Sequence, residues 1–576
     1  MSDLIVKVGG EGGTDSPTTA GELITLSAIR EGNSVFTLRT LPAEIKGGLA
    51  TYQVRMCDHE VLSPGDGPDV LCCMNQEAYD RLLDELKPDG GVLVYDSDTV
   101  TPSPHANGFI YYGVPLSSIS AESIKERRTK NMVLLGALAG LFGIPVETLK
   151  QTVKDKYGRR SEEVVAVNNA AIDAGFQFVE QELPKLDSHH FTPNPDNRET
   201  RRMVIDGSEA VAIGAAAAHC AVYAGYPITP ASDIMHWLAK HLPKLGGTVI
   251  QTEDEISALG ACLGASFAGA RTMTATSGPG LSLMVELLGL GTMTELPVVV
   301  VDAMRGGPST GLPTKCESGD LNLAVYGAHG DAPRIVVAPA DIHDCLYDTI
   351  GAFNLAEKYQ TPVILLSDQS MAMRTQAIAK PDLSQVELVQ RKIEREQGRD
   401  FKRYELTEDG ISAMAVPGTP TDQYHLVTGL AHDETGSPST NDGELSAAMM
   451  DKRLRKIQAA RLEGGWSRLH GPDRGAIGVI SWGSLEGALV EATERLAAEG
   501  HAVRVLHLRM LSPLPIEELE AFAATVDKLV VCELNHSGQL QRLIRAETEL
   551  KPGLINKYDG VPFTPREIAS ALRKEL

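Results

Sequence analysis

The chain has 576 residues, 43% of them hydrophobic, and a formal net charge of −23. This length is enough for several buried cores, and we expect three domains. The negative charge argues against nucleic acid as a general partner. No apolar run is long enough to span a membrane, and the first residues lack the basic and apolar segments of a signal peptide, so we expect a soluble protein of the cytoplasm.

Residues 1–195 are predicted to form an α/β domain. A strand over 4–8 leads into the glycine-rich segment 9–13, a beginning that superficially resembles a dinucleotide-binding loop. Glu11 and Asp15 in or beside that loop would repel a pyrophosphate. We therefore do not assign nucleotide binding to it.

A helix over 161–182 and a polar segment over 187–195 are predicted to lead into a second domain, over 196–374. Its strands and helices alternate, as in a parallel doubly wound sheet. Four segments follow its strands: Tyr226-Pro227-Ile228-Thr229-Pro230, Glu255, Ser277-Gly278-Pro279 and Arg305. Each alone has an ordinary explanation as a turn, an extended loop or a first-turn acid. Together they should converge, because the carboxyl ends of parallel strands meet at one edge of a sheet.

The chemistry of these residue types fits one kind of site. A glutamate in a dry, apolar setting can share a proton with a nitrogen heterocycle. A guanidinium group grips a carboxylate in a planar fork, and a threonine hydroxyl can donate to a keto oxygen.

Residues 375–473 have an irregular pattern that predicts a long excursion or linker. Residues 474–576 alternate between strand and helix again, with strands over 476–482 and 502–508 around a helix over 485–498, and predict a compact α/β domain. The eight cysteines show no Cys-x-x-Cys spacing, so we expect no metal or iron–sulfur site in this chain, and Cys316 is expected to be a buried filler.

With these motifs the chain resembles the α subunit of 2-oxoacid:ferredoxin oxidoreductases with a γ domain fused before it. The run Arg-Gly-Gly-Pro-Ser-Thr-Gly-Leu-Pro-Thr over 305–314 is similar to the 2-oxoglutarate and branched-chain types. The resemblance implies an α/β chain in which a pyrimidine-binding, thiamine diphosphate domain over 196–374 lies between a γ-like domain over 1–195 and a transketolase C-terminal-like domain over 474–576.

The resemblance also implies roles for the four segments. Glu255 would activate thiamine diphosphate, and Thr229 and Arg305 would contact the 1-carboxylate and keto group of a 2-oxoacid. The cofactor-binding residues would be Tyr226, Pro227, Ile228, Thr229, Glu255, Ser277, Gly278 and Pro279. In the γ-like domain, segment 44–48 would lie towards coenzyme A.

Thiamine enzymes hold Mg²⁺ and diphosphate with a Gly-Asp-Gly followed about thirty residues later by asparagine. Here Gly65-Asp66-Gly67 is followed by Tyr95 and Asp96, so we interpret it as a surface turn. The resemblance therefore implies a β subunit that carries Mg²⁺, the diphosphate site and a [4Fe-4S] cluster, in an (αβ)₂ heterotetramer. This chain alone should be inactive.

The implied reaction is the coenzyme A-dependent oxidative decarboxylation of a 2-oxoacid, with electrons passed to ferredoxin. 2-Oxoglutarate, giving succinyl-CoA and carbon dioxide, is the leading substrate, and the reverse direction would fix carbon dioxide. Pyruvate, branched-chain 2-oxoacids and indolepyruvate stay open, as do a lipoamide-linked enzyme or a carboligase. An alternative of another class is a non-catalytic assembly or regulatory subunit.

Overall fold

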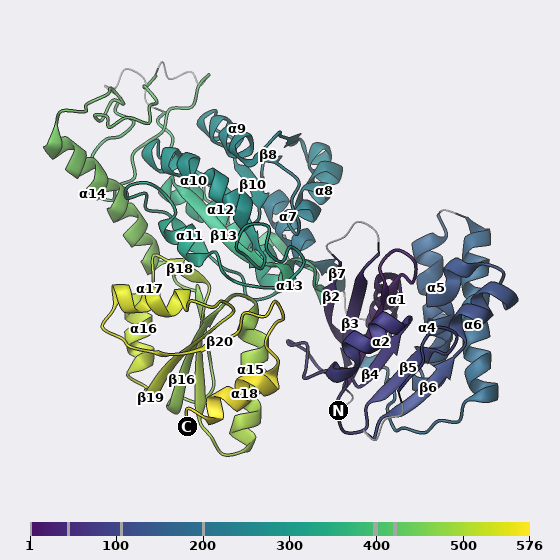
Figure 1. Ribbon diagram of the computed structural model, residues 1–576. Coiled ribbons are helices and arrows are strands. Elements are labelled where there is room, and N and C mark those ends of the chain that lie inside the picture. Colours follow the sequence, from purple (N-terminus) through teal and green to yellow (C-terminus); the bar gives the residue numbers. More distant parts are fainter. Residues whose placement is uncertain are drawn as a thin grey trace. The chain divides into compact units, whose positions relative to one another are not determined.

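The computed structural model describes residues 3–42, 47–103, 108–159, 161–198, 202–395, 401–418 and 423–576. Residues 44–46 of the segment expected near coenzyme A lie outside these ranges. The chain divides into two compact units (Figure 1). Unit 1 comprises Met1–Ile205, Met373–Lys380 and Thr564–Glu567, and unit 2 comprises Asp206–Ala372, Pro381–Phe563 and Ile568–Leu576.

Unit 1 contains a six-stranded sheet in the order β2-β3-β1-β4-β5-β6. The strands are β1 (Asp3–Glu11), β2 (Ser34–Thr40), β3 (Leu49–Cys57), β4 (Val70–Cys73), β5 (Val92–Asp96) and β6 (Ile110–Val114). The helices are α1 (Pro17–Arg30), α2 (Gln76–Leu82), α3 (Leu116–Ser118), α4 (Lys130–Phe142), α5 (Val146–Tyr157) and α6 (Glu162–Glu182). Side chains of α1, α4, α5 and α6 share one core with the sheet, and those of α2 form a second core with alternate residues of β4.

Helices α4 and α6 pack with their backbones in close approach. A Cβ added at Gly136 would overlap the Ile172 carbonyl group, and one added at Gly175 would overlap that of Val133. Because glycine has no Cβ, the backbones of the two helices can approach each other this closely. The predicted helix over 161–182 is confirmed as α6, and it contributes to the core of unit 1.

The glycine-rich segment of unit 1 is closed by an acid that lies beside it in the chain. Strand β1 stays paired with β3 as far as Glu11, opposite Leu49. Asp15 then folds back, and its Oδ2 accepts hydrogen bonds from the Glu11 N–H and the Asn75 side chain, both at 2.9 Å. Lys130 pairs with the same carboxylate at 3.0 Å. These contacts hold the Asp15 carboxylate against the segment.

Unit 2 contains a seven-stranded sheet in the order β18-β12-β13-β11-β10-β8-β9. Its strands are β8 (Val222–Gly225), β9 (Thr248–Gln251), β10 (Thr272–Thr276), β11 (Val298–Met304), β12 (Ile335–Val337), β13 (Pro362–Asp368) and β18 (Met510–Ser512). The helices before, between and after these strands, as far as β13, are α7 (Gly207–Ala217), α8 (Ser232–His241), α9 (Glu255–Phe267), α10 (Gly278–Met293), α11 (Leu321–Tyr326), α12 (Ile342–Tyr359) and α13 (Gln369–Ala372). All neighbours are parallel except β12 and β18. The predicted doubly wound sheet is confirmed.

The described part of the segment after this sheet contains one long helix, α14 (Gly443–Ala459). Buried charges attach it to the sheet layer: Lys452 Nζ donates to both carboxylate oxygens of Glu295 at 2.6 Å, and Lys456 Nζ donates to Oε2 at 2.8 Å. The three side chains are almost completely buried. Strand β14 (Thr375–Ala379) precedes this segment and pairs with β7 (Arg202–Asp206).

The last part of the chain forms a five-stranded sheet in the order β15-β17-β16-β19-β20. Its elements are β15 (Ser467–His470), β16 (Gly475–Trp482), α15 (Glu486–Ala498), β17 (Val503–Leu508), α16 (Ile516–Ala523), β19 (Val526–Glu533), α17 (Gln539–Glu547), β20 (Gly553–Asn556) and α18 (Pro565–Arg573). The predicted α/β alternation is present. None of the helices in the described ranges combines the length and apolar composition that a membrane crossing needs.

Candidate active site

The four predicted segments all follow strands of the seven-stranded sheet in unit 2. Tyr226–Pro230 follows β8, Glu255 follows β9, Ser277–Pro279 follows β10 and Arg305 follows β11. These strands are parallel neighbours in the order β11-β10-β8-β9, so their carboxyl ends share one edge. The structure therefore brings the predicted segments to that edge.

Glu255 is the first residue of α9, and its neighbour Asp254 caps the helix by accepting a hydrogen bond from the Ser257 N–H at 2.7 Å. The Glu255 side chain is only 5% exposed. It reaches the start of α10, where a Cβ added at Gly280 would lie 2.5 Å from Glu255 Oε1. The carboxyl group is thus held against glycine backbone in a nearly dry setting, which suits an acid that exchanges a proton with a heterocycle.

Gly280→Ala is expected to displace the Glu255 carboxyl group, because the new methyl group would also overlap Thr276 Oγ1. With Glu255 as the proton-exchanging acid that the sequence predicts, turnover per folded protein should fall at least about tenfold, because a small shift of such a group has a large kinetic effect, and overpacking of this buried site should also lower stability. Gly289→Ala in the same helix is the matched control, because a Cβ there would meet no atom within 4 Å. Equal turnover of the two variants would contradict this placement of Glu255.

Ser277 caps α10 with its backbone, since its carbonyl oxygen accepts from the Gly280 N–H at 2.8 Å and the Leu281 N–H at 2.9 Å. Its side-chain hydroxyl is buried and has no hydrogen-bond partner among the described residues. A buried hydroxyl in that condition is costly unless a ligand or water satisfies it. Gly278 and Pro279 form the first turn of the helix beside it.

Arg305 and the Tyr226–Pro230 segment are joined directly. Arg305 is buried, and its Nη1 donates a 2.7 Å hydrogen bond to the carbonyl oxygen of Thr229. Thr229 and Tyr226 remain exposed at the edge of the sheet. Burial lowers the pKa of Arg305 from its usual value, although nearby acids oppose the shift.

Comparison with known proteins gives a consistent assignment over the whole chain. The family model for the thiamine diphosphate-binding region of pyruvate flavodoxin/ferredoxin oxidoreductases matches residues 213–452. Models for pyruvate ferredoxin/flavodoxin oxidoreductase and for core domain II of pyruvate:ferredoxin oxidoreductase match residues 5–178 and 476–568.

Two curated relatives are similar over the full length. The α subunit of 2-oxoacid:ferredoxin oxidoreductase 2 of Aeropyrum pernix is 32% identical, covering 100% of this chain and 98% of the relative. The 2-oxoglutarate oxidoreductase subunit KorA of Mycobacterium tuberculosis is 32% identical over 100% of this chain and 92% of its own. The chain belongs to the 2-oxoacid:ferredoxin oxidoreductase family. The family and enzyme class predicted from the sequence are confirmed.

A solved structure of this oxidoreductase family also matches. It is the 2-oxoglutarate:ferredoxin oxidoreductase from Magnetococcus marinus with 2-oxoglutarate, coenzyme A and succinyl-CoA bound. It is 43% identical, covers 100% of both chains and has a TM-score of 0.94. The predicted three-part α/β architecture is thereby confirmed.

Two acids that the sequence analysis did not single out lie at the same carboxyl edge of the seven-stranded sheet. Asp302, near the end of β11, is 0% exposed, and Asp320 precedes α11. Burial raises the pKa of Asp302 well above its usual value, and Asp320 raises it further, while Arg305 opposes both. Burial also raises the pKa of Asp320, to about 6. An acid inside the valine-rich run of β11 was the signal in the sequence that could have identified Asp302.

The carboxylates at Asp66 and Asp96 in unit 1 have protein partners. Asp66 accepts a hydrogen bond from the Arg566 N–H at 2.8 Å. Asp96, which stands where an asparagine ligand would be needed, pairs with Lys130 at 3.0 Å and accepts a hydrogen bond from Ser117 at 2.6 Å. These contacts are those of a structural turn.

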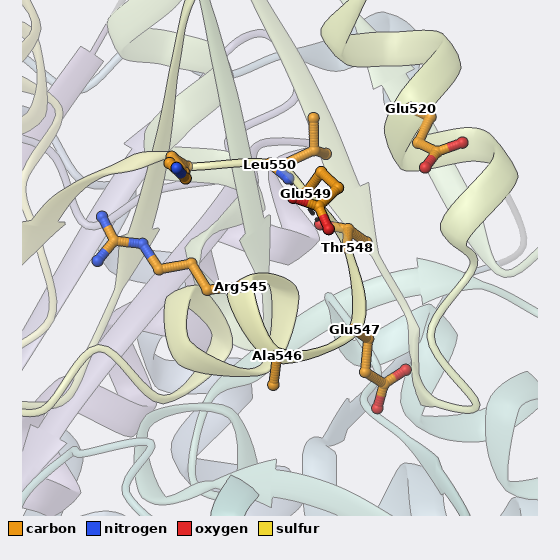
Figure 2. A pocket seen from close by; sticks show the side chains of 8 residues that line it. Glu520, Arg545, Ala546, Glu547, Thr548, Glu549 and Leu550 are labelled. Atoms are coloured by element: carbon orange, nitrogen blue, oxygen red, sulfur yellow. Dashed lines mark hydrogen bonds between the residues drawn. The ribbon is translucent and has the colours of Figure 1, made fainter.

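A cavity of about 560 Å³ lies in the part of unit 2 that holds the five-stranded sheet, away from these residues (Figure 2). It is lined by Glu520, Arg545, Ala546, Glu547, Thr548, Glu549, Leu550 and Lys551. Figure 2 shows two of these residues, Glu520 and Glu547, on separate segments of the chain. None of the predicted site residues lines it.

Proposed function

We propose that this chain is the α subunit of a thiamine diphosphate-dependent 2-oxoglutarate:ferredoxin oxidoreductase. The enzyme would convert 2-oxoglutarate and coenzyme A to succinyl-CoA and carbon dioxide and reduce ferredoxin. The observation that carries the proposal is the meeting of Glu255, Thr229 and Arg305 at one edge of the sheet. The full-length similarity to a structure with 2-oxoglutarate, coenzyme A and succinyl-CoA bound supports the choice of substrate.

The residues at this edge fit thiamine diphosphate. The Glu255 carboxyl group is dry and held against Gly280, and the Ser277 hydroxyl is buried without a partner in the described part of the chain. When bound, thiamine diphosphate would supply the electron sink for decarboxylation. Glu255 would hold and return a proton at a nitrogen of the aminopyrimidine ring. The cofactor would be lined by Tyr226, Pro227, Ile228, Thr229, Ser277, Gly278 and Pro279.

Arg305 is placed to receive the 1-carboxylate that all 2-oxoacids share. Its guanidinium group is buried and fixed by the Thr229 carbonyl oxygen, so a carboxylate binding beside it would meet a positive charge that is shielded from water. The Thr229 hydroxyl, on an exposed residue, would donate to the keto oxygen. Arg305 and Thr229 would thus orient the substrate for carbon–carbon cleavage.

A partner subunit is needed to complete this site. Apolar side chains near the predicted segments are exposed, including Tyr226 at 42%, Ile256 at 47% and Leu283 at 50%. Strand β9 is an edge strand, with residues that are largely exposed. An exposed apolar surface of this kind marks an interaction site. We infer that a β subunit covers it and supplies Mg²⁺, the diphosphate site and a [4Fe-4S] cluster in an (αβ)₂ complex.

Arg305→Lys in the purified complex tests the proposal. Lysine keeps the charge but loses the planar fork, so kcat/KM should fall for 2-oxoglutarate and pyruvate alike. The fall should correspond to a loss of about 1–3 kcal/mol of transition-state stabilisation. The measurement is 2-oxoacid-dependent ferredoxin reduction with coenzyme A. Arg573→Lys, an exposed pair with Glu499, is the control.

Two results would change the assignment. A loss confined to 2-oxoglutarate would make Arg305 the reader of the distal carboxylate. Wild-type turnover that prefers pyruvate, branched-chain 2-oxoacids or indolepyruvate would replace 2-oxoglutarate as substrate while leaving the reaction class intact.

A further inference from the structure

Asp302 lies near the carboxyl end of β11, the central strand of the seven-stranded sheet. On β11 it stands in register with Thr276 of β10 on one side and Leu366 of β13 on the other. Its side chain is completely buried, and neither of its oxygens receives a hydrogen bond from any donor in the described residues. An ionised carboxylate in such a place would be very costly.

Asp320, in the loop before α11, lies within side-chain hydrogen-bonding range of Asp302. A Cβ added at Gly278 would lie 2.6 Å from Asp320 Oδ2, so this carboxyl group stands against the first turn of α10. Its Oδ2 also lacks a donor among the residues that the structure describes. The positive end of the α10 dipole favours a negative charge at this point, which makes Asp320 the better place for one.

Two ionised carboxylates can only accept hydrogen bonds, so they repel each other, but one proton between them creates a donor and removes one charge. Arg305 follows Asp302 by three residues and interacts electrostatically with both acids. One shared proton leaves the pair with a single negative charge, which balances Arg305. If both carboxyl groups were ionised, Asp302, Asp320 and Arg305 together would carry a net negative charge. That charge would weaken the binding of an anion at Arg305.

We propose that Asp302 and Asp320 share one proton in the neutral range and form the counter-charge that regulates anion binding at Arg305. A carboxylate that binds Arg305 brings a negative charge towards Asp320, and the pair responds by taking a second proton from solvent. This inference rests on the proposed role of Arg305. The two acids are positioning residues, since they act on the substrate through Arg305.

The direction of the pH dependence follows from the order of the two protons. Burial and the charge of Asp320 keep the proton on Asp302, while the pKa of Asp320, near 6, marks the second step. Below about pH 6 the pair is neutral and Arg305 attracts anions at full strength. Above about pH 6 the pair carries a negative charge, which competes with the substrate anion for Arg305. Substrate affinity should therefore fall as pH rises through this range.

The other charged groups described around Asp302 and Asp320 do not neutralise the negative charge of the pair. Glu317 adds a negative charge that raises the pKa of Asp320. The charge of His536 lowers the pKa of Glu317 and so acts on that residue, not directly on the pair. Asp368, at the end of the neighbouring strand β13, accepts hydrogen bonds from the Met371 N–H and the Ser484 hydroxyl. Arg305 is the cation that acts on both Asp302 and Asp320.

The first test does not involve substrate. Infrared spectroscopy of the wild-type complex at pH 7 should show, besides any band of Asp348, whose pKa burial raises to about 8, a first C=O band of a protonated, buried carboxyl group, and lowering the pH to 5 should add a second. Asp302→Asn should remove the first band and Asp320→Asn the second, whereas the exposed Asp451→Asn, in α14, should change neither. Absence of the pH 7 band from the wild-type complex would overturn the proposal whether or not the variants fold.

The second test measures 2-oxoglutarate binding by calorimetry in buffers with different ionisation heats. Wild type should take up protons on binding, and its Kd should rise by up to about tenfold per pH unit above pH 6. Asp320→Asn should bind several-fold more tightly at pH 8, with no proton uptake. Retention of the wild-type pH dependence in Asp320→Asn would refute the counter-charge role. If wild type shows the infrared band but does not bind 2-oxoglutarate, the proposed function fails and the shared proton stands.

Discussion

Glu255→Gln is expected to reduce turnover of the assembled complex by about 10²–10⁴-fold, the usual contribution of a positioned acid or base. Glutamine keeps the shape of the side chain and can still fit against Gly280, but it cannot exchange a proton with the cofactor. Thiamine diphosphate affinity should therefore change much less than turnover. The measurements are steady-state ferredoxin reduction and calorimetric titration of the complex with thiamine diphosphate and Mg²⁺.

The matched control is Glu494→Gln, which removes an exposed carboxylate from α15, outside the segments that carry the site. It should have wild-type turnover. Unchanged turnover in Glu255→Gln would favour the other class of function, a non-catalytic assembly or regulatory subunit that keeps the fold.

Glu295→Gln is expected to produce the largest loss of stability. Glu295 is the shared partner of Lys452 and Lys456, all three buried in unit 2. Burial opposes ionisation of Glu295, but Lys456, Lys452 and Arg403 outweigh it and hold its pKa below the usual range. Removing one partner of a buried ion pair costs about 3–5 kcal/mol, because the charges left behind have no compensation.

Denaturant unfolding of the complex measures this loss, and hydrogen exchange should show earlier opening of α14 than of the sheet. The comparison variant is Glu499→Gln, whose partner Arg573 is exposed, and its midpoint should match wild type. A Glu295→Gln midpoint equal to that of the comparison variant would mean that the buried cluster contributes nothing to stability.

The sequence predicted the strand–turn–helix units around the site because each carries a local signal. Glu255 follows a short strand and opens a helix of small residues, and the turn at Ser277 contains glycine and proline that suit a helix start. The convergence of these turns follows from the parallel sheet alone. The link between Arg305 and the Thr229 carbonyl group was expected only as a shared location, since side-chain geometry is a tertiary property.

Other features had no local signal. The chain between 375 and 473 was expected to be irregular, yet it contains α14, whose inward-facing side chains include Lys452 and Lys456. Lysines are almost never fully buried, so nothing in the pattern pointed to a packed helix. Asp320 lies 18 residues beyond Asp302, and their pairing depends on how the loop before α11 returns to the sheet.

The outermost strand on one side of the seven-stranded sheet, β18, comes from a late part of the chain. Strand β18, at Met510–Ser512, pairs with β12, and Lys452 follows Glu295 by 157 residues. During synthesis the strands that carry the site are therefore made long before the segment that covers their edge and the lysines that neutralise Glu295. A nascent chain that ends after β13 lacks β18 beside β12 and the two lysines that pair with Glu295, so this layer reaches its final form only when most of the chain has left the ribosome.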